Sequence, residues 1–187
     1  MSAPQTDATA SHYPTPAVHE REEQHTLSVL VDNEPGVLAR VIGLFSGRGY
    51  NIDSLTVTET EHEAHLSRIT IITKGTPMVI EQIKAQLERM VPVHRVNDLT
   101  VSGTSLEREL ALVKVAGKGD KRVEALRLAE AFRASVVDAS TEHFVFEITG
   151  RTSKLEQFIS LMGPLGLVEV ARTGVAAIGR GPAAMSA

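Results

Sequence analysis

The sequence contains no cysteine, and this and similar absences exclude several classes of protein. Without cysteine there can be no disulfides and no thiolate metal sites. No apolar run approaches the roughly 20 residues that a helix needs to span a bilayer. Lys and Arg number 19 against 23 Asp and Glu, giving a net charge of −4, which offers no general attraction for nucleic acid or anionic lipid. We therefore expect a cytoplasmic protein that binds neither nucleic acid nor membrane.

The first 24 residues differ in composition from the rest of the chain. They are rich in Ser, Thr, Pro and Gln and contain one Arg and four acidic residues. They have no apolar segment of the kind found in secretory signals, and they are too acidic for a mitochondrial transit peptide. Such a segment cannot bury enough surface to order itself. We expect residues 1–24 to form a disordered tail.

From His25 onward the pattern is that of alternating strands and helices. The stretch HTLSVLVD alternates with a period of two, which predicts a strand. A helix over residues 35–47 is expected next, with Pro35 in its first turn, Asn33 or Asp32 as its cap, and Gly47 and Gly49 at its end. Its apolar stripe consists of Val37, Leu38, Val41, Ile42 and Phe45.

The same order of elements occurs twice along the chain. Strands YNIDSLTVTET and LSRITIITK, a helix opened by Thr76-Pro77 and a strand VHRVNDLTVS complete a β-α-β-β-α-β unit over residues 25–102. A second unit covers residues 107–181, and a short tail covers 182–187. In the second unit we expect a helix from Asp120 and a capping box opened by Ser153. The buried stripe of the Asp120 helix is expected to be Val123, Leu126, Ala129 and Phe132. The predicted fold class is α+β, with two ferredoxin-like βαββαβ domains in tandem.

One face of such a sheet carries both helices, so the other face should be polar unless something covers it. In the first unit, Leu30 and Ile72 are out of phase with the core-facing residues of their strands. They suggest a surface for a second copy of the chain, although scattered exposed apolar residues are also normal.

The stretch DNEPGVLARVIGLFSGRGYNIDSL, residues 32–55, places Asn and Gly at both ends of one helix. The start of a helix offers free N–H groups and a positive dipole end to a carboxylate. Gly36 lets a ligand approach the backbone, and Asn33 carries both a donor and an acceptor. Val37, Leu38 and Ile52 could supply an apolar wall. These residues would suit a small aliphatic amino acid, but caps and turns account for them equally well.

Other groups of polar residues favour plain structural interpretations. His62 and His65 lack the spacing of a helical zinc motif, and the sequence predicts neither a metal site nor a catalytic site. The basic residues Arg151, Lys154, Arg172 and Arg180 are expected to be solvated surface. The β-α-β-β-α-β order is also that of an RNA-recognition motif. That alternative is not favoured, because the strands LSVLV and SRITIIT have no aromatic residue on which bases could stack.

The stretches HTLSVLVDNEPGVLARVIGLFSGRGYNIDSLTV, LSRITI, ERELALVKV and VEVARTGVAAIGRG closely resemble the small, regulatory subunits of acetolactate synthase. The resemblance covers His25 to Gly181 and implies that residues 25–102 form an ACT domain. It implies a non-catalytic protein that binds and activates a larger, thiamine-diphosphate-dependent catalytic subunit and makes it sensitive to inhibition by valine. That enzyme condenses two pyruvates, or pyruvate with 2-ketobutyrate, at the start of branched-chain amino acid synthesis. Thiamine diphosphate, magnesium and FAD are expected only in the catalytic subunit.

The resemblance also implies where valine binds and how the chain assembles. In the family, valine lies between two ACT domains of a homodimer. One domain contributes the residues that match Asn33, Pro35, Gly36, Val37 and Leu38, and the other contributes those that match Asn51 and Ile52. The apolar segment 174–181 could pack on the second domain or on the catalytic subunit. A stand-alone ACT sensor of another enzyme is the alternative, but the second unit, which resembles this family specifically, argues against it.

Overall fold

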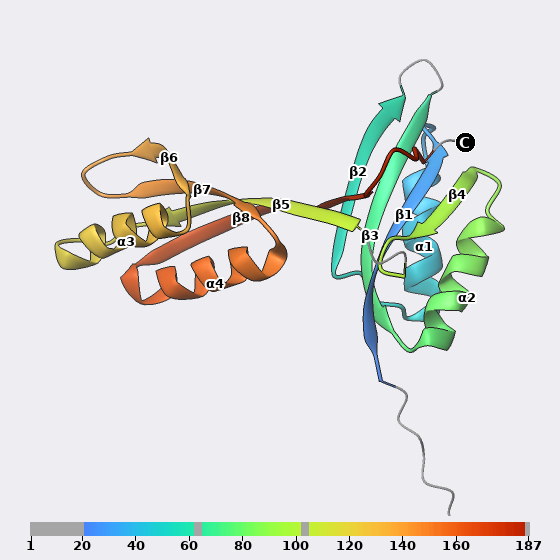
Figure 1. The fold of residues 1–187 in the computed structure, drawn as a ribbon, viewed down its shortest axis with the longest axis horizontal. Helices are drawn as coiled ribbons and strands as arrows, with labels where there is room; N and C mark the ends of the chain where they lie inside the picture. Colours follow the sequence, from blue (N-terminus) through green and yellow to red (C-terminus); the bar gives the residue numbers. More distant parts are fainter. Residues whose placement is uncertain (1–20, 62–64, 102–104, 186–187) are drawn as a thin grey trace, which may run out of the picture.

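The computed structural model describes residues 21–61, 65–101 and 105–185, which form two units of the same design (Figure 1). The first unit consists of β1 (Glu23–Asp32), α1 (Val37–Arg48), β2 (Ser54–Glu61), β3 (Leu66–Gly75), α2 (Pro77–Glu88) and β4 (Val93–Asp98). The second consists of β5 (Ser105–Val115), α3 (Asp120–Ala131), β6 (Ser135–Ala139), β7 (Phe144–Gly150), α4 (Thr152–Met162), a short 3₁₀ helix η1 (Gly163–Leu165) and β8 (Leu167–Gly179). The sheet orders β2-β3-β1-β4 and β6-β7-β5-β8 are equivalent. The predicted α+β fold of two ferredoxin-like units is confirmed.

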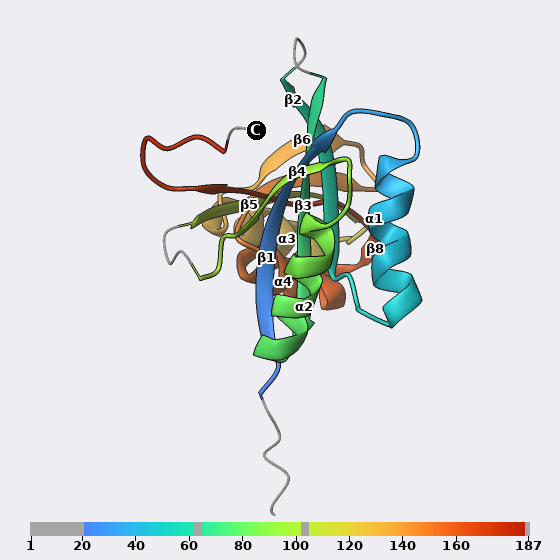
Figure 2. The same cartoon turned by 90° about the vertical axis from the view of Figure 1, so that its right-hand side faces the viewer.

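The helices of each unit cover one face of its sheet. Figure 2 shows α1 and α2 in front of the first sheet and the second unit behind it, on the opposite side of that sheet. β1 begins at Glu23, two residues before the predicted start of the first domain, and β5 begins at Ser105, in the interval between the two predicted domains. Residues 1–20 of the predicted tail lie outside the described residues. No helix in the described part of the chain is long and apolar enough to cross a bilayer.

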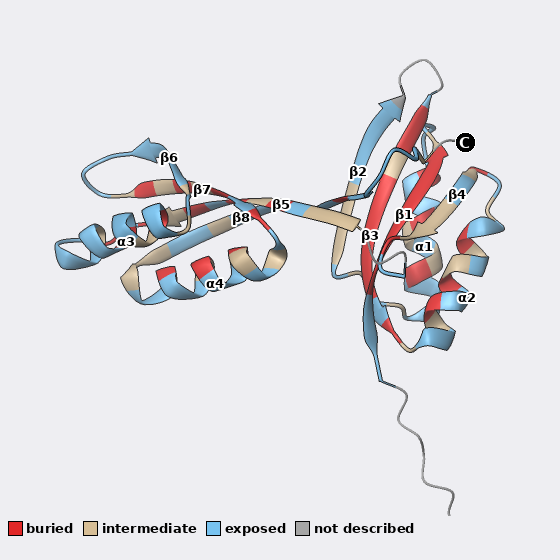
Figure 3. Ribbon diagram, in the orientation of Figure 1, coloured by how far each residue is buried: buried red, intermediate tan, exposed pale blue. Residues whose placement is uncertain are grey.

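The first core lies between the sheet and the two helices, and β1 and β3 contribute alternate residues to it. Figure 3 shows that β1 and β3 are buried along most of their length. Leu27, Val29 and Val31 are at most 1% exposed, as the period of two predicts. Thr76 caps α2 by accepting a hydrogen bond from the Val79 N–H, which confirms the predicted helix start. The helices contribute Val37, Val41 and Phe45 from α1 and Ile80, Ile83 and Leu87 from α2.

In the second unit, α3 faces its sheet with a different stripe from the one predicted. Ala125 and Ala129 are buried, whereas Val123 and Leu126 are 49% and 38% exposed. Phe132 is half-buried and packs on the second core. The helix therefore buries its small alanines and turns the larger Val123 and Leu126 outward. The predicted stripe is therefore wrong at Val123 and Leu126.

The predicted caps of both helices in the second unit are also wrong. The N-cap of α3 is Gly119, at φ +57°, and Asp120 lies in the first turn. The N-cap of α4 is Arg151, and α4 begins at Thr152, so Ser153 opens no capping box. Among the described residues, no side chain caps either helix.

The face of the first sheet that lies away from its helices is covered by β8 and the residues that follow it. Figure 1 shows this C-terminal segment passing from the second unit onto the first sheet. The Val175 N–H donates to Ser54 Oγ at 3.0 Å, and the Val175 carbonyl accepts from Thr56 Oγ1 at 2.9 Å. Farther along, the Ser28 hydroxyl donates to Met185 Sδ at 3.3 Å. Val175 to Gly179 also pair with β5, so the segment 174–181 packs on the second domain, as one of the two predicted alternatives has it, and on the first unit as well.

This cover explains the two apolar residues that are out of phase. Leu30 is 0% exposed and Ile72 is 4% exposed within a single chain. The expectation that they form a surface for a second copy is therefore wrong, because their own chain buries them.

Candidate functional site

Three of the predicted ligand residues lie in the loop before α1, and the other two on this side, Val37 and Leu38, are the first residues of the helix. Val37 is 3% exposed and fixes the end of the loop on the first core, whereas Leu38, 37% exposed, faces outward. The Asn33 N–H donates to the His65 carbonyl at 2.7 Å, which ties the loop to the start of β3. The predicted residues in the loop, all exposed, are Asn33, Pro35 and Gly36.

The helix begins two residues later than predicted, because Gly36 is its N-cap with φ +88°. A residue in this left-handed region cannot continue a right-handed helix, and glycine adopts it without steric cost. Pro35 therefore lies before the first turn. Neither Asn33 nor Asp32 caps the helix, so the predicted helix start is wrong.

The start of α1 is open to a ligand. No side chain of the described residues caps it. The first hydrogen bond of the helix is the one that the Arg40 N–H donates to the Gly36 carbonyl, at 3.0 Å. The N–H groups of Leu38 and Ala39 come before it and therefore have no acceptor within the helix. A Cβ added at Gly36 would meet nothing within 4 Å. A carboxylate therefore has room to reach free N–H groups at the positive end of the helix dipole.

The turn after α1 is fixed by side chains of β3. Asn51 Nδ2 donates to Asp53 Oδ1 at 2.6 Å, and the other Asp53 oxygen lies 3.1 Å from Lys74 Nζ. Thr73 Oγ1 donates to the Asn51 carbonyl at 2.5 Å. Ile52 is half-buried against the first core. The turn thus holds the exposed Asn51 amide in a defined orientation.

Asp53, Thr73 and Lys74 hold this turn, and none of them was among the site residues predicted from the sequence. Asp53 is adjacent to Asn51 and Ile52 in the sequence, but its pairing with Lys74 depends on how β3 lies against the turn. No motif in the sequence specifies that register.

The loop and the turn lie at opposite ends of α1. This helix has 12 residues, and at about 1.5 Å per residue it is about 18 Å long. One chain therefore does not bring Asn33 and Asn51 together. A site that uses both requires the loop of one copy and the turn of another.

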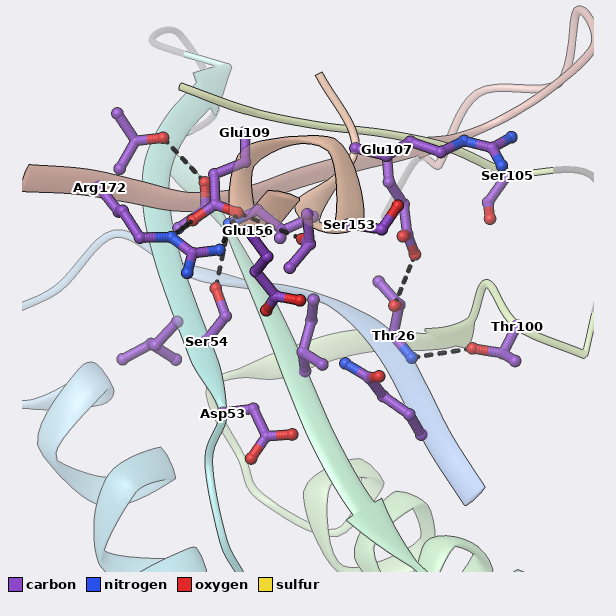
Figure 4. Close-up of a pocket in the computed structure, with 18 of the residues that line it drawn as sticks. Thr26, Asp53, Ser54, Thr100, Ser105, Glu107, Glu109, Ser153, Glu156 and Arg172 are labelled. Carbon is purple, nitrogen blue, oxygen red and sulfur yellow. Dashed lines mark hydrogen bonds and ion pairs between the residues drawn. The ribbon is translucent and has the colours of Figure 1, made fainter. Parts of the chain in front are cut away.

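A polar cleft of about 1120 Å³ lies between the two units (Figure 4). On one side lies Glu109, which is only 4% exposed. Its carboxylate accepts hydrogen bonds from Arg172 Nε and Nη2, at 2.8 and 2.7 Å. It also accepts one from Thr152 Oγ1 at 3.2 Å. The hydrogen bond to Glu109 raises the pKa of Arg172. On the other side Thr26 Oγ1 donates to Glu107 Oε1 at 2.7 Å.

The prediction that Arg172 is merely solvated surface is therefore wrong. Its side chain is 35% exposed, and it supplies the partner of a buried acid. The signal in the sequence was Glu109 at the start of the apolar strand ELALVKV, because a buried carboxylate needs a partner.

The described residues contain no group of three or more His, Asp or Glu side chains that could hold a metal ion. His62, one of the two histidines weighed above, lies outside the described residues.

Models of two protein families match the chain. The model described as the small subunit-like ACT domain of AHAS (acetohydroxyacid synthase, another name for acetolactate synthase) matches residues 27–95. The model described as the small subunit of acetolactate synthase matches residues 108–181. The first match contains α1, the loop before it and the turn after it. The second contains Glu109 and Arg172.

Whole proteins match over most of their length. The chain is 48% identical over 158 residues to a probable acetolactate synthase small subunit of Archaeoglobus fulgidus, covering 84% of this chain and 98% of that protein. It is 46% identical to the acetolactate synthase isozyme 3 small subunit of Escherichia coli, covering 83% and 94%. The crystal structure of the acetolactate synthase small subunit from Thermotoga maritima superposes with a TM-score of 0.78 at 42% identity, covering 86% and 99%. The chain therefore belongs to the family of acetolactate synthase small subunits.

Proposed function

We propose that this chain is the regulatory subunit of an acetolactate synthase, that it binds and activates the catalytic subunit, and that it confers inhibition by valine. The names of its relatives support a catalytic-subunit partner. The thiamine diphosphate, magnesium and FAD of the reaction belong, in this proposal, to that partner. The regulatory chain contributes a binding site whose occupancy changes the assembly.

The observation that carries the valine site is the open start of α1. It combines free backbone N–H groups, an uncapped helix end and a glycine with empty space where a side chain would lie. The carboxylate of valine binds the N–H groups of Leu38 and Ala39, and the isopropyl group lies against Leu38.

The second copy completes the site in this proposal. Its Asn51 amide, oriented by Asp53, provides the oxygen that accepts from the ammonium group of valine. Its Ile52 adds to the apolar wall. Pro35 and Asn33 shape the loop that receives the ligand. Because valine contacts two chains, binding stabilises one pairing of ACT domains over others and so becomes a signal to the partner.

Reconstitution with the catalytic subunit tests the proposal. The chain should raise acetolactate formation and make it sensitive to valine, and alone it should form no acetolactate. Gly36→Asp should preserve activation but raise the valine concentration needed for inhibition at least about tenfold, because it places a negative charge beside the bound carboxylate.

Gly119→Asp is the matched control. Gly119 is also a helix N-cap at positive φ with nothing within 4 Å of an added Cβ, but it lies in the second unit. It should keep both activation and valine inhibition. Unchanged valine inhibition in Gly36→Asp would exclude the α1 start as the site. Turnover by the isolated chain would refute the regulatory role.

The alternative is an ACT-type sensor that regulates another enzyme. Capture of binding partners with the full chain distinguishes it from the regulatory subunit of an acetolactate synthase. Recovery of an unrelated enzyme in place of the acetolactate synthase catalytic subunit would favour it.

A further inference from the structure

A second cavity lies where β2 and β3 of the first unit meet the start of β5 and the end of β8. Its volume is about 330 Å³. It is separate from the α1 start and contains none of the predicted valine residues. The second unit supplies its apolar wall, which includes Leu106, Ala177 and Ile178, and the first unit supplies hydroxyl groups, including that of Thr70.

Two arginines line this cavity. Arg68 lies on β3 between Thr58 of β2 and Leu30 of β1. Its Nε is fully covered and has no hydrogen-bond partner among the described residues. A covered donor without an acceptor costs about 1–3 kcal/mol, so such a group calls for an explanation. Arg108 is the other arginine, and its Nη1 donates to the Glu107 carbonyl at 2.7 Å.

The charge of the lining residues is unbalanced. Both charged side chains among them are arginines, and the lining includes no carboxylate. The guanidinium group matches a carboxylate in shape and charge. The apolar wall suits a hydrocarbon group, and the volume is at the small end of the range for ligand pockets. A ligand with an ammonium group would find no acidic partner in this lining.

We propose that this cavity binds a small aliphatic monocarboxylate that lacks an ammonium group. The guanidinium of Arg68, a half-buried residue that lines the cavity, donates to the carboxylate, Arg108 adds positive charge, and the hydrocarbon part lies against Leu106 and Ile178. Since the two units contribute opposite walls, the ligand also stabilises their docking.

The probe is 3-methylbutanoate, which is valine without its amino group. Calorimetry on the full chain measures its affinity, and methyl NMR locates it through the shift of the Ile178 signal. Saturable binding is expected, with the Ile178 methyl moving and the Leu38 methyls unchanged. Arg68→Met should weaken binding at least about tenfold by removing a charge-assisted hydrogen bond.

Two further variants distinguish loss of the site from misfolding and from the general loss of a positive charge. Ile178→Glu places a negative charge at a side chain that is already 54% exposed, and it should also weaken binding. Arg95→Met is the control, because Arg95 is exposed and lies on β4, on the far side of Leu30 from Arg68. It should bind the probe as the unchanged chain does.

The possible contrary results are distinct. The proposal would be overturned if the probe showed no saturable binding. It would also be overturned if Arg68→Met and Ile178→Glu bound the probe as tightly as the unchanged chain does. Loss of probe binding in Gly36→Asp with Arg68→Met unaffected would place the probe at the α1 start instead. Inorganic phosphate that displaces the probe at equal concentration would show a general anion site, which would contradict the aliphatic class.

Discussion

Gly174 is the residue on which the docking of the two units depends most directly. It lies on β8 with φ +79°, where it touches β2. A Cβ added there would lie 2.9 Å from both Ser54 Oγ and Thr56 Cγ2. Those two side chains are the ones that bond to Val175. Gly174→Ala therefore strains the backbone and pushes apart the two strands.

The cost can be worked out from these contacts. Alanine in the left-handed region costs about 1–2 kcal/mol. Overpacking against β2 costs about 1–3 kcal/mol. Each hydrogen bond of Val175 that is lost removes about 0.5–1.5 kcal/mol. With one hydrogen bond lost, these contributions add to a total of about 2.5–6.5 kcal/mol. Most of this loss should weaken the docking of the units, and little of it should destabilise either sheet.

Gly181→Ala provides the control, because Gly181 has φ +97° and nothing within 4 Å of an added Cβ. It should lose only the backbone contribution. Calorimetry should show two separated unfolding transitions for Gly174→Ala, and X-ray scattering should show a larger radius of gyration. Since β2 begins directly after the Asn51 turn, valine inhibition in the reconstituted complex should weaken as well. If Gly174→Ala unfolds and scatters like Gly181→Ala, the β2–β8 contact does not dock the units.

Three further predictions concern single side chains. Asn51→Ala should weaken valine binding by about 1–3 kcal/mol, measured by calorimetry, with little change in stability because the side chain is exposed. Glu109→Gln should destabilise the second unit by about 2–3 kcal/mol in urea unfolding, less than a fully buried pair would lose, because Arg172 is 35% exposed. The Lys114 ammonium, hydrogen-bonded to Glu169, lowers the pKa of Glu169 below its ordinary 4.5. The stability from this pair should thus be present above pH 4.5 and lost as the pH falls below it, and Glu169→Gln should show a smaller loss on acidification.

The local parts of the fold could be predicted from the sequence. Alternation identified β1 with Leu27, Val29 and Val31 inside, and the Thr76-Pro77 pair identified the start of α2. Each of these signals lies within a few neighbouring residues. The order of the elements then restricted the fold to two ferredoxin-like units, because that order recurs.

What could not be predicted depends on φ angles and on partners far away in the chain. The start of α1 was misplaced because Pro35 is as acceptable before a helix as in its first turn, and only the φ of Gly36 decides. The stripe of α3 was misplaced because alanines and larger apolar residues offer two competing faces. The partner of Glu109 is 63 positions away, at Arg172. No local pattern reports such a pairing.

The ligand residues form an intermediate case. The structure places Asn33, Pro35 and Gly36 in the loop before α1, Val37 and Leu38 in its first turn, and Asn51 with Ile52 in the turn after it, as their order in the chain requires. Whether the two groups meet is a property of the assembly of two chains, so it stays a prediction that only the complex can test.

The cover over the first sheet has a consequence for synthesis on the ribosome. Ser28 and Met185, which meet across this face, are 157 positions apart. At about 5–20 residues per second, translation of that interval takes roughly 8–30 s. During that time Leu30 faces solvent or chaperones, and Ile72 does so once it has been made. Their neighbours on the same face include Thr26, Ser28 and Thr70. The hydroxyl groups of these residues can be hydrated until β8 and the residues that follow it have been made and cover the face.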